Sequence, residues 1–525
     1  MSEPESEPKS RPKSEPSPQA AQPIVEALHA IASRSQARFY LPGHKGGQGA
    51  PDILREALGE TVWRWDLPEL PDFDTLAIPT GAIAEAQTLA ARAFGADRTW
   101  FLCNGSTAGV IAALSATCRP GDRVLMPRNV HRSAISGLVQ CGAVPVFAAP
   151  SIAAPDIDPD WNIDRGLQPE AVARALDRHP ELAAIFLVSP NYYGLSCDLP
   201  AIVRLARAAE VHRNSPLPVI VDAAHGSHFP FHSDLPAAAL AAGADVAIES
   251  THKTLGALSQ ASMLHLKGDR VDADRLDRAL SLVQSTSPNA LLLASLDAAR
   301  HQMATAGRDW LDRTLHCADR LRAGAIACGW PVWHPSATAK IASSVASSDE
   351  RFDRTRITLR TQDFGLSGYS ADDWLYERGV AAELPTDRHL TFVVTLGNTD
   401  ADVDRALEAL RGLKALRSTG DRAPDLAIDL DTAAWPELSE PELSPRDAFF
   451  AETETIVLAQ SRDRICADTL CPYPPGIPLL FPGERITAQS IAALENIAGS
   501  GGTITGWPGA GQVRVVRRAR MAGGS

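Results

Sequence analysis

The chain has 525 residues, 45% of them apolar, and this length predicts two or three domains rather than one small module. It carries 63 acidic and 50 basic side chains, and the formal charge of −13 excludes nucleic acid and anionic membrane surfaces as expected partners. No apolar run reaches the roughly 18 to 20 residues that span a bilayer and no signal peptide is recognisable, so with eight scattered cysteines we expect a cytoplasmic protein with reduced thiols.

The first predicted unit is residues 1–20, which consist mainly of Ser, Pro, Glu and Lys. Such a stretch buries too little apolar surface to offset the entropy of ordering, so it predicts a disordered tail. Residues 21–75 follow as an N-terminal segment. The run at 82–95 then repeats apolar residues at helical spacing and ends at Gly95, which is typical of a helix with a glycine cap, and a strand-like WFL comes next.

From residue 76 to 310, helical stretches alternate with short β-branched runs. This alternation predicts an α/β large domain in which helices cover a mostly parallel sheet. Its clearest strands are expected at 122–127, 183–190, 218–222 and 244–250.

A smaller α+β domain is predicted at 311–434. A long helical stretch comes first, followed by a strand at 356–360, a helix at 370–379 and a strand at 390–397. A stretch rich in Pro and Glu then marks a boundary, so residues 435–525 are assigned to a C-terminal domain.

The first candidate site is NGSTAG at 104–109, between the WFL strand and an apolar helical stretch. A turn that opens a helix offers backbone N–H groups, hydroxyls and the positive end of the helix dipole to an anion. Ser106 and Thr107 are therefore candidates to hold a phosphate. An ordinary Ser/Thr helix cap explains the same pattern about equally well.

The second candidate site is VDAAHGSHFPF at 221–231, where Asp222 ends a predicted strand and His225 and His228 follow in the loop. Ligands of open α/β sheets bind at this end of the strands. Taken alone, Asp222 is slightly better explained as a turn or helix cap, and metal ligation by the aspartate and the histidines is another alternative.

The third candidate site is ESTHKTLGALSQ at 249–260, where Lys253 follows a predicted strand beside hydroxyl side chains. A lysine is usually a solvated surface charge, but burial at a strand end would lower its pKa and give a usable amine nucleophile. The three sites together supply an anion cup, a carboxylate and a lysine. This set suits pyridoxal 5'-phosphate, which has a phosphate, a ring nitrogen and an aldehyde, and no metal site is predicted.

Eight blocks of sequence occur in order: LPGHKGG (41–47), FLCNGSTAG (101–109), PRNVHRSAISGL (127–138), SPNYYG (189–194), VDAAHGSHF (221–229), ESTHKTLGALSQASMLH (249–265), QSTSP (284–288) and PYPPGIPLLFPGE (472–484). These blocks resemble the Orn/Lys/Arg decarboxylase family, group III of the pyridoxal-phosphate decarboxylases, and its short bacterial members in particular. The resemblance implies an aspartate-aminotransferase-like fold (fold type I), with a cofactor-binding large domain and smaller α+β C-terminal domains.

The resemblance also implies roles for single residues. Lys253 would bind the cofactor's aldehyde, Asp222 would pair with the ring nitrogen, and His131 would stack on the ring. His225 would lie against the cofactor. The phosphate would be held by Ser106, Thr107, Ser250 and His252.

In this fold the active site lies at a dimer interface, so the resemblance implies a homodimer or a larger assembly in which Ser285 or Thr286 reaches the cofactor of a neighbouring subunit. Longer family members carry an N-terminal wing that helps build decamers, for which the 20-residue tail leaves no room. A second departure is the loop Ala223, Ala224, His225, where related sequences often carry an acidic residue or a tryptophan, and it concerns substrate geometry.

The implied reaction is decarboxylation of a basic L-amino acid, part of amino-acid and polyamine metabolism. Arginine, giving agmatine, is favoured, with lysine to cadaverine and ornithine to putrescine as alternatives. Lys253 or His252 would return a proton to Cα. Glu484 is the best candidate to bind the distal cation, although a solvated surface glutamate is equally compatible. His44 and Lys45 either line the site entrance or lie in a loop shaped by glycines.

Two rival functions remain open from the sequence. A fold type I aminotransferase or lyase shares the fold and the lysine, and an aminotransferase would need an arginine such as Arg360 or Arg388 for the substrate α-carboxylate. A non-catalytic binding or regulatory relative would typically lose Lys253 or Asp222, and this chain has both.

Overall fold

The computed structural model describes residues 18–149, 161, 163–213, 215–335, 351–417, 437–473, 476–499, 501–509 and 511–518. The predicted disordered tail lies outside these residues up to residue 17, and its last three residues form the 3-10 turn η1 (Pro18–Ala20). In the described part of the chain, no helix is long and apolar enough to cross a membrane.

The centre of the molecule is an eight-stranded sheet in the order β1-β7-β6-β5-β4-β2-β3-β11. Strands β2 to β6 pair in parallel, whereas β7 runs antiparallel to both of its neighbours and β11 runs antiparallel to β3. The mostly parallel sheet predicted from the sequence is confirmed. Its strands are β1 (Arg98–Leu102), β2 (Arg123–Pro127), β3 (Val144–Ala148), β4 (Ala184–Val188), β5 (Val219–Asp222), β6 (Val246–Glu249), β7 (Ser262–Leu266) and β11 (Leu438–Ser439).

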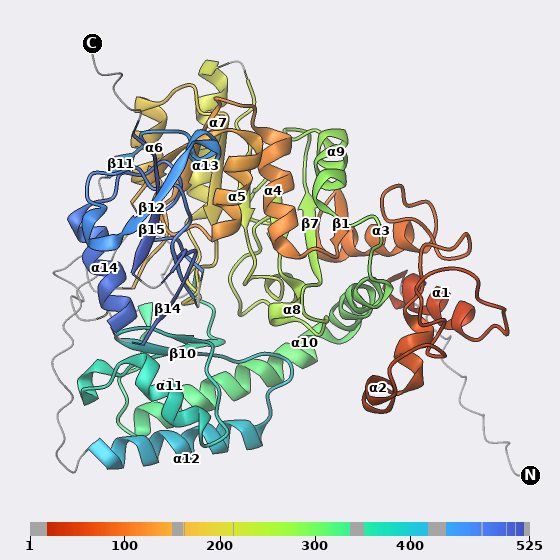
Figure 1. Cartoon of the computed structure of the whole chain (residues 1–525). Coiled ribbons are helices and arrows are strands. Elements are labelled where there is room, and N and C mark those ends of the chain that lie inside the picture. Colours follow the sequence, from red (N-terminus) through yellow and green to blue (C-terminus); the bar gives the residue numbers. More distant parts are fainter. Residues whose placement is uncertain are drawn as a thin grey trace, which may run out of the picture.

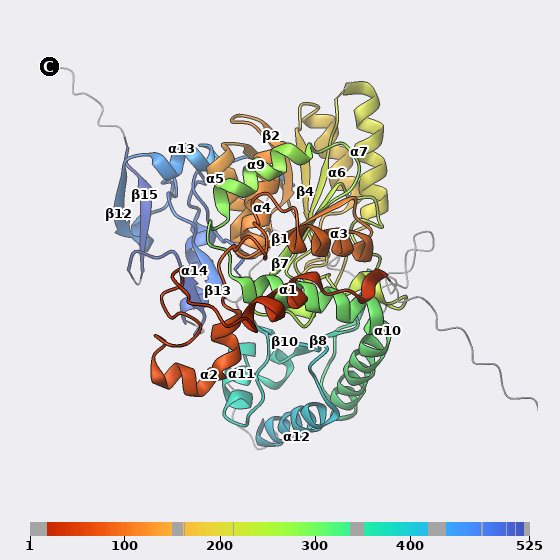
Figure 2. The ribbon, with the colours of Figure 1, turned by 90° about the vertical axis from the view of Figure 1, so that its right-hand side faces the viewer.

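Helices cover both faces of this sheet because alternate strand residues point to opposite faces (Figures 1 and 2). One face packs on α4 (Gly105–Thr117), α5 (Arg132–Cys141) and α9 (Ala273–Val283). The other face packs on α6 (Pro169–Arg178) and α7 (Leu199–Arg213) and, near β1 and β7, on α1 (Pro23–Ala32), α3 (Ala82–Phe94) and α10 (Ala290–Ala327).

Helix α4 lies unusually close to the sheet at Gly109. A Cβ atom there would lie 2.7 Å from Leu102 Cδ1 and 2.8 Å from Ile248 Cγ2, distances that packed carbon atoms do not reach. Glycine at this position therefore lets the N-terminus of α4 come down beside the ends of β1 and β6.

The small domain follows on the long helix α10, which departs from helical geometry at Ala306. The predicted boundary at residues 310 and 311 falls inside this helix. A three-stranded sheet in the order β8-β10-β9 packs against two further helices. The elements are β8 (Arg356–Arg360), η5 (Gln362–Phe364), α11 (Gly368–Tyr376), β9 (Leu384–Pro385), β10 (His389–Val393) and α12 (Asp400–Arg417).

The C-terminal part begins by adding β11 to the edge of the central sheet and then forms its own small core. Two pairs of antiparallel strands, β12 with β15 and β13 with β14, flank helix α14 (Figure 1). The elements are α13 (Pro445–Phe450), β12 (Thr453–Val457), η7 (Leu458–Gln460), β13 (Cys471–Tyr473), α14 (Ala488–Gly499), β14 (Thr503–Thr505) and β15 (Gln512–Val516).

The N-terminal segment is fastened to α10 by a buried ion pair between Asp297 and Arg300, both with fully buried side chains. Asp297 Oδ2 accepts a hydrogen bond of 2.9 Å from the backbone N–H of Ile24 at the start of α1. Arg300 donates to the carbonyl of Gln19 over 2.8 Å and to that of Ala21 over 2.6 Å. Each buried charge thus has a partner, and the pair fastens residues 19–24 to α10.

We predict that Arg300→Gln lowers the free energy of unfolding by about 3 to 5 kcal/mol, because the change leaves the carboxylate of Asp297 buried without its cation. Urea unfolding followed by circular dichroism measures this loss. The matched control is Arg34→Gln, which breaks an ion pair with Asp72 whose side chains are 43% and 62% exposed, and we expect it to cost at most about 1 kcal/mol. Equal losses in the two variants would contradict the anchoring role.

Candidate active site

Asp222 is the last residue of β5, and Lys253 lies in the short helix α8 (Thr251–Thr254) directly after β6. Since β5 and β6 are parallel neighbours, with Asp222 opposite Ile248, both side chains lie at the same edge of the sheet. Burial raises the pKa of Asp222, while the charge of Lys253 and a 3.2 Å hydrogen bond from Ala224 N–H oppose the rise. The charges of Asp222 and Lys253 therefore influence each other directly.

The Lys253 amine faces an imidazole. Its Nζ lies 3.2 Å from His225 Nε2, and the ring of Tyr192 meets that imidazole edge-on with centroids 4.8 Å apart. Burial lowers the pKa of Lys253, and the charge of Asp222 opposes this. Burial also lowers the pKa of His225 well below its ordinary value, as does the nearby charge of Lys253.

His131 caps the start of α5, where its Nδ1 accepts a 3.2 Å hydrogen bond from the backbone N–H of Ser133. Burial lowers the pKa of His131 to about 4, helped by the charge of Lys253. The imidazole is therefore neutral near pH 7. The ring lies against Gly476, where a Cβ atom would come within 3.1 Å of it. Gly476 also has a φ of +94°, so both the lack of space and the backbone conformation favour glycine at this position.

The N-terminus of α4 lacks a side-chain cap, because Asn104 Oδ1 instead accepts from the backbone N–H of Ser285 over 3.1 Å. Ser250 Oγ donates a 2.8 Å hydrogen bond to Ser106 Oγ, which joins this turn to the residues before Lys253. Backbone N–H groups and two hydroxyls thus gather at the positive end of a 13-residue helix, an arrangement that suits an anion.

The other residues that the sequence suggested for binding the phosphate or a neighbouring subunit lie near this turn. Thr107, Ser285 and Thr286 are exposed. His252 donates from Nδ1 to the carbonyl of Ala261 over 2.9 Å, and burial lowers its pKa. The structure therefore brings the sequence blocks that carry Ser106, Lys253 and Ser285 together around one helix end.

Two charged residues of the site were missed from the sequence. Arg356, the first residue of β8, is 1% exposed and lies 3.5 Å from His225 Nδ1 through Nη2. Asp353 is fully buried, 3.4 Å from the Arg356 guanidinium and 3.2 Å from the imidazole of His228. The sequence showed only a strand at this position, and no local pattern indicates that an arginine 131 residues away in the chain faces His225.

The two arginines named from the sequence have other contacts. Arg360 pairs with Asp363 at 2.6 Å, and its guanidinium lies over the ring of Trp161. Arg388 lies 3.6 Å from the carboxylate of Asp387. Arg356 contacts the loop after Asp222 from the small domain.

Glu484 is not a solvated surface residue. Its side chain is 19% exposed, and its carboxylate accepts a 2.8 Å hydrogen bond from Arg128 and one of 3.2 Å from Phe481 N–H. Burial raises its pKa to about 7, against the opposing charge of Arg128. Arg128 stands three residues before His131 and further donates to the carbonyls of Pro478 and Leu479, so this pair holds the C-terminal domain on the loop that carries His131.

The N-terminal loop residues His44 and Lys45 have partners of their own. His44 Nε2 lies 3.1 Å from Asp66 Oδ2, and the Lys45 amine donates to the carbonyl of Tyr40. Among the residues that the structure describes, no group of three or more His, Cys, Asp or Glu side chains is suited to hold a metal ion.

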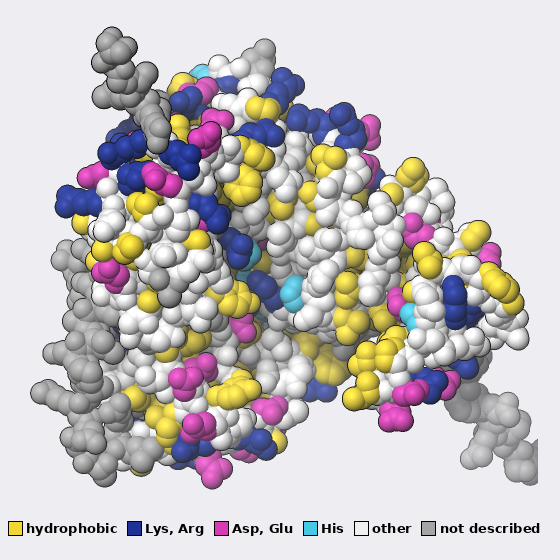
Figure 3. Space-filling model, in the orientation of Figure 1, with side chains coloured by type: hydrophobic (Ala, Val, Ile, Leu, Met, Phe, Trp, Pro, Cys, Tyr) yellow, Lys and Arg dark blue, Asp and Glu magenta, His cyan; other side chains and the backbone are white. Residues whose placement is uncertain are grey.

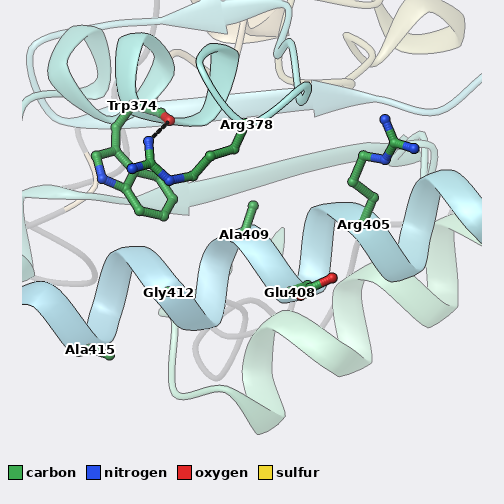
Figure 4. A pocket seen from close by; sticks show the side chains of 7 residues that line it. All are labelled: Trp374, Arg378, Arg405, Glu408, Ala409, Gly412 and Ala415. Carbon is green, nitrogen blue, oxygen red and sulfur yellow. Dashed lines mark hydrogen bonds between the residues drawn. The ribbon is translucent and has the colours of Figure 1, made fainter.

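Figure 3 shows histidine and basic side chains reaching the surface near the middle of one face, between the region of β14 and that of α8. A separate surface groove of about 800 Å³ lies between α11 and α12, where Arg378 lies 3.6 Å over the ring of Trp374 (Figure 4). That groove contains none of the candidate active-site residues. It is lined by Trp374, Arg378, Arg405, Glu408, Ala409, Gly412 and Ala415.

Comparison with known families identifies the lineage of the chain. The model of the Orn/Lys/Arg decarboxylase major domain matches residues 22–402, and that of the Orn/Lys/Arg decarboxylase C-terminal domain matches residues 428–511. The chain belongs to the Orn/Lys/Arg decarboxylase family. The resemblance seen in the sequence motifs is therefore confirmed, and the family models cover both the large domain and the C-terminal part.

Curated relatives agree with this assignment. An arginine decarboxylase from Bacillus subtilis (strain 168) is 36% identical over 483 residues, which cover 91% of this chain and 93% of the relative. One from Bacillus anthracis is 36% identical over 90% of this chain and 92% of its own. The constitutive lysine decarboxylase of Escherichia coli (strain K12) is 26% identical over 90% of this chain and 76% of its own.

The fold is likewise that of solved family structures. A lysine decarboxylase from Francisella novicida superposes with a TM-score of 0.78 at 21% identity, over 95% of this chain and 82% of its own. Lysine decarboxylase A from Pseudomonas aeruginosa gives a TM-score of 0.77 at 23% identity, over 94% of this chain and 80% of its own. The predicted fold class, an aspartate-aminotransferase-like large domain with smaller α+β domains, is confirmed.

Glu484 has two candidate roles, namely to position the His131 loop through Arg128 or to bind the distal cation of the substrate, and one substitution distinguishes them. If Glu484 positions the His131 loop, Glu484→Gln weakens binding of pyridoxal phosphate by about tenfold, or about 1.4 kcal/mol, and leaves the KM of the substrate nearly unchanged. If it binds the substrate's distal cation, the KM rises and cofactor binding stays. The matched control is Glu442→Gln, which removes a half-exposed partner of Arg485 in the same part of the chain. Cofactor titration and steady-state kinetics measure both quantities.

Proposed function

We propose that this protein is a pyridoxal-phosphate-dependent decarboxylase of a basic L-amino acid, with arginine as the preferred substrate and agmatine as the product. The observation that carries the proposal is the Lys253 amine, which lies beside buried Asp222 at the edge of the sheet and 3.2 Å from a buried histidine. Family membership supports the same chemistry.

The residues present fit the three parts of this cofactor. The N–H groups of α4, with Ser106 and Ser250, offer a phosphate site. Asp222 offers a buried carboxylate for the ring nitrogen, and neutral His131 offers a flat face for the ring. Thr107, His252, Ser285 and Thr286 are the further cofactor contacts of the proposal.

When bound, pyridoxal phosphate supplies a sink for the electron pair that remains on Cα after carbon dioxide departs. The chain's own residues do the rest. Asp222 would pair with the ring nitrogen and hold a proton there, and Lys253 would bind the aldehyde through Nζ. Lys253, or His252 as the alternative donor, would supply the proton that returns to Cα. Burial of the site keeps water from competing for these positions.

The preference for arginine rests on the relatives. Four curated bacterial arginine decarboxylases are 36 to 37% identical over at least 90% of this chain, whereas three lysine decarboxylases are 25 to 28% identical. A planar guanidinium and an ammonium demand different pockets, so substrate preference follows the more similar group.

The rival functions make different demands. An aminotransferase binds the substrate α-carboxylate through a guanidinium, whereas Arg360 and Arg388 contact aspartates of their own. Arg356, the nearest of these three arginines to Lys253, is paired with Asp353. A non-catalytic relative would have no need of a buried lysine whose pKa is lowered. Both rivals are therefore less well supported than the decarboxylase.

We expect the purified protein to absorb near the roughly 420 nm typical of a lysine-bound pyridoxal cofactor and to release carbon dioxide from arginine faster than from lysine or ornithine. Lys253→Ala removes the amine and should abolish both signals, while Asp222→Ala should retain weak cofactor binding and lose most of the rate. Release of carbon dioxide from none of the three amino acids would contradict the proposed function.

We further propose that the protein is a homodimer or larger assembly, with Ser285 or Thr286 facing the neighbouring subunit. The support is the N-terminal arm that projects from the body at α2 (Asp52–Trp65) (Figure 1), a helix without a buried residue. The arm carries several large apolar side chains that are exposed in the single chain, and a group of such side chains is typical of an association surface. They are Phe39, Leu41, Ile53, Leu54 and Leu58.

Ile53→Asp should shift the sedimentation coefficient of the full-length protein towards that of a monomer, because a charge at a buried interface loses its hydration without gaining a partner. Val211→Asp is the matched control, since Val211 is equally exposed but lies on α7, far from α2 in both ribbon views (Figures 1 and 2). An arm that plays no part in assembly would give the same sedimentation for both variants and the wild type.

A further inference from the structure

His225 stands between two cationic side chains. Its Nε2 lies 3.2 Å from Lys253 Nζ, and on the opposite side of the ring its Nδ1 lies 3.5 Å from Arg356 Nη2, which also donates to the His225 carbonyl over 3.4 Å. Lys253 belongs to the large domain and Arg356 to the first strand of the small domain. One imidazole thus bridges the two domains at the reactive amine.

The chemistry of the partners decides where the proton of His225 lies. A guanidinium carries only donors and keeps its charge at any ordinary pH, so Nδ1 facing Arg356 must be the acceptor. A neutral imidazole then carries its proton on Nε2. That N–H points at Lys253 Nζ, and only an uncharged amine has a lone pair to accept it.

Arg356 is itself held by charges of the small domain and the loop. It is 1% exposed, and Asp353 three residues earlier lies 3.4 Å from it. Asp353 is fixed in turn by Thr355, whose N–H and hydroxyl donate over 2.9 and 2.7 Å, and by His228 at 3.2 Å. The guanidinium is therefore a fixed cation, oriented before any ligand binds.

We propose that Arg356 is a positioning residue that fixes the tautomer of His225 and thereby keeps Lys253 as a neutral amine, ready to capture an aldehyde. The proposal rests on the proposed function in one respect, namely that Lys253 is the cofactor-binding amine. It assigns to a small-domain residue a role in the chemistry of a large-domain residue.

The electrostatics of the site agree with this arrangement. Burial lowers the pKa of Lys253 first, and the charge of Arg356 lowers it further, whereas Asp222 and Glu383 act in the opposite direction. The three histidines within reach of its charge all have lowered pKa values, which disfavours a further cation beside Lys253. They are His131, His225 and His252.

A direct test measures the titration of Lys253 itself. The full-length protein, freed of cofactor, is treated with formaldehyde and cyanoborohydride across a pH series, and methylation of the peptide that contains Lys253 is quantified by mass spectrometry. Only the neutral amine reacts, so the midpoint of the rate against pH reports the pKa of Lys253. We expect Arg356→Gln to raise this midpoint by about one pH unit, because it removes the nearby charge and frees His225 to accept from an ammonium.

Arg300→Gln is the matched control for a purely structural effect. Arg300 is equally buried and is also paired with an aspartate three residues earlier, but it lies on α10 in contact with the N-terminal segment. This variant should lose stability without moving the Lys253 midpoint. Arg356→Lys keeps a donor and a charge, so its midpoint should lie between those of the wild type and Arg356→Gln.

A second variant covers the case in which Arg356→Gln does not fold. His225→Ala removes the bridging imidazole without adding apolar bulk and leaves the ion pair of Arg356 and Asp353 intact, and it too should raise the midpoint. An unchanged midpoint in these variants, with only a loss of stability, would overturn the proposal. A wild-type protein with a lowered midpoint that releases no carbon dioxide would overturn the proposed function and leave the role of Arg356 standing.

Discussion

The parallel pairing of β5 with β6 is the constraint on which the site depends. Adjacent parallel strands end at the same edge of a sheet, so Asp222 and Lys253 come together although 31 residues separate them in the chain. Neither residue needs a flexible loop to reach the other, because Asp222 ends β5 and Lys253 lies in the short helix that follows β6. The close approach of α4 at Gly109 then brings an uncapped helix end to the same edge.

Burial gives this edge its chemistry. The lysine and the histidines around it lose water, and each loses its charge more easily as a result. The carboxylate of Asp222 is affected in the opposite sense, since burial favours its protonated form. A buried edge with one acid, one amine and neutral imidazoles changes its charge state readily when a charged ligand enters, because no water screens the change.

The sequence predicted the parts of the site that depend on local patterns. Strand ends, a Gly-Ser-Thr turn and a lysine after a strand are visible in short windows, and they led to Asp222, Ser106 and Lys253. It did not indicate the contact of Arg356 with His225 or that of Arg128 with Glu484. The first pair is separated by 131 positions in the chain and the second by 356, and contacts over such separations leave no periodic pattern in the sequence. The long helix α10 likewise conceals the domain boundary, since helical periodicity continues through it without a break in composition.

The site is assembled from three parts of the chain, and a buried ion pair lies at each of the two junctions beside apolar contacts such as that between Phe147 and Phe481. Asp353 and Arg356 pair within the small domain and contact His228 and His225 of the loop after β5, and Arg128 and Glu484 attach the C-terminal domain to the loop before α5. A buried pair adds little stability compared with apolar packing, but breaking it is costly, so it restricts the geometry of the parts that it joins. Both pairs lie next to a histidine of the site, His225 in one case and His131 in the other, which means that the position of each imidazole follows the docking of a whole domain. The reactive amine between them is therefore correctly surrounded only when all three parts are in place.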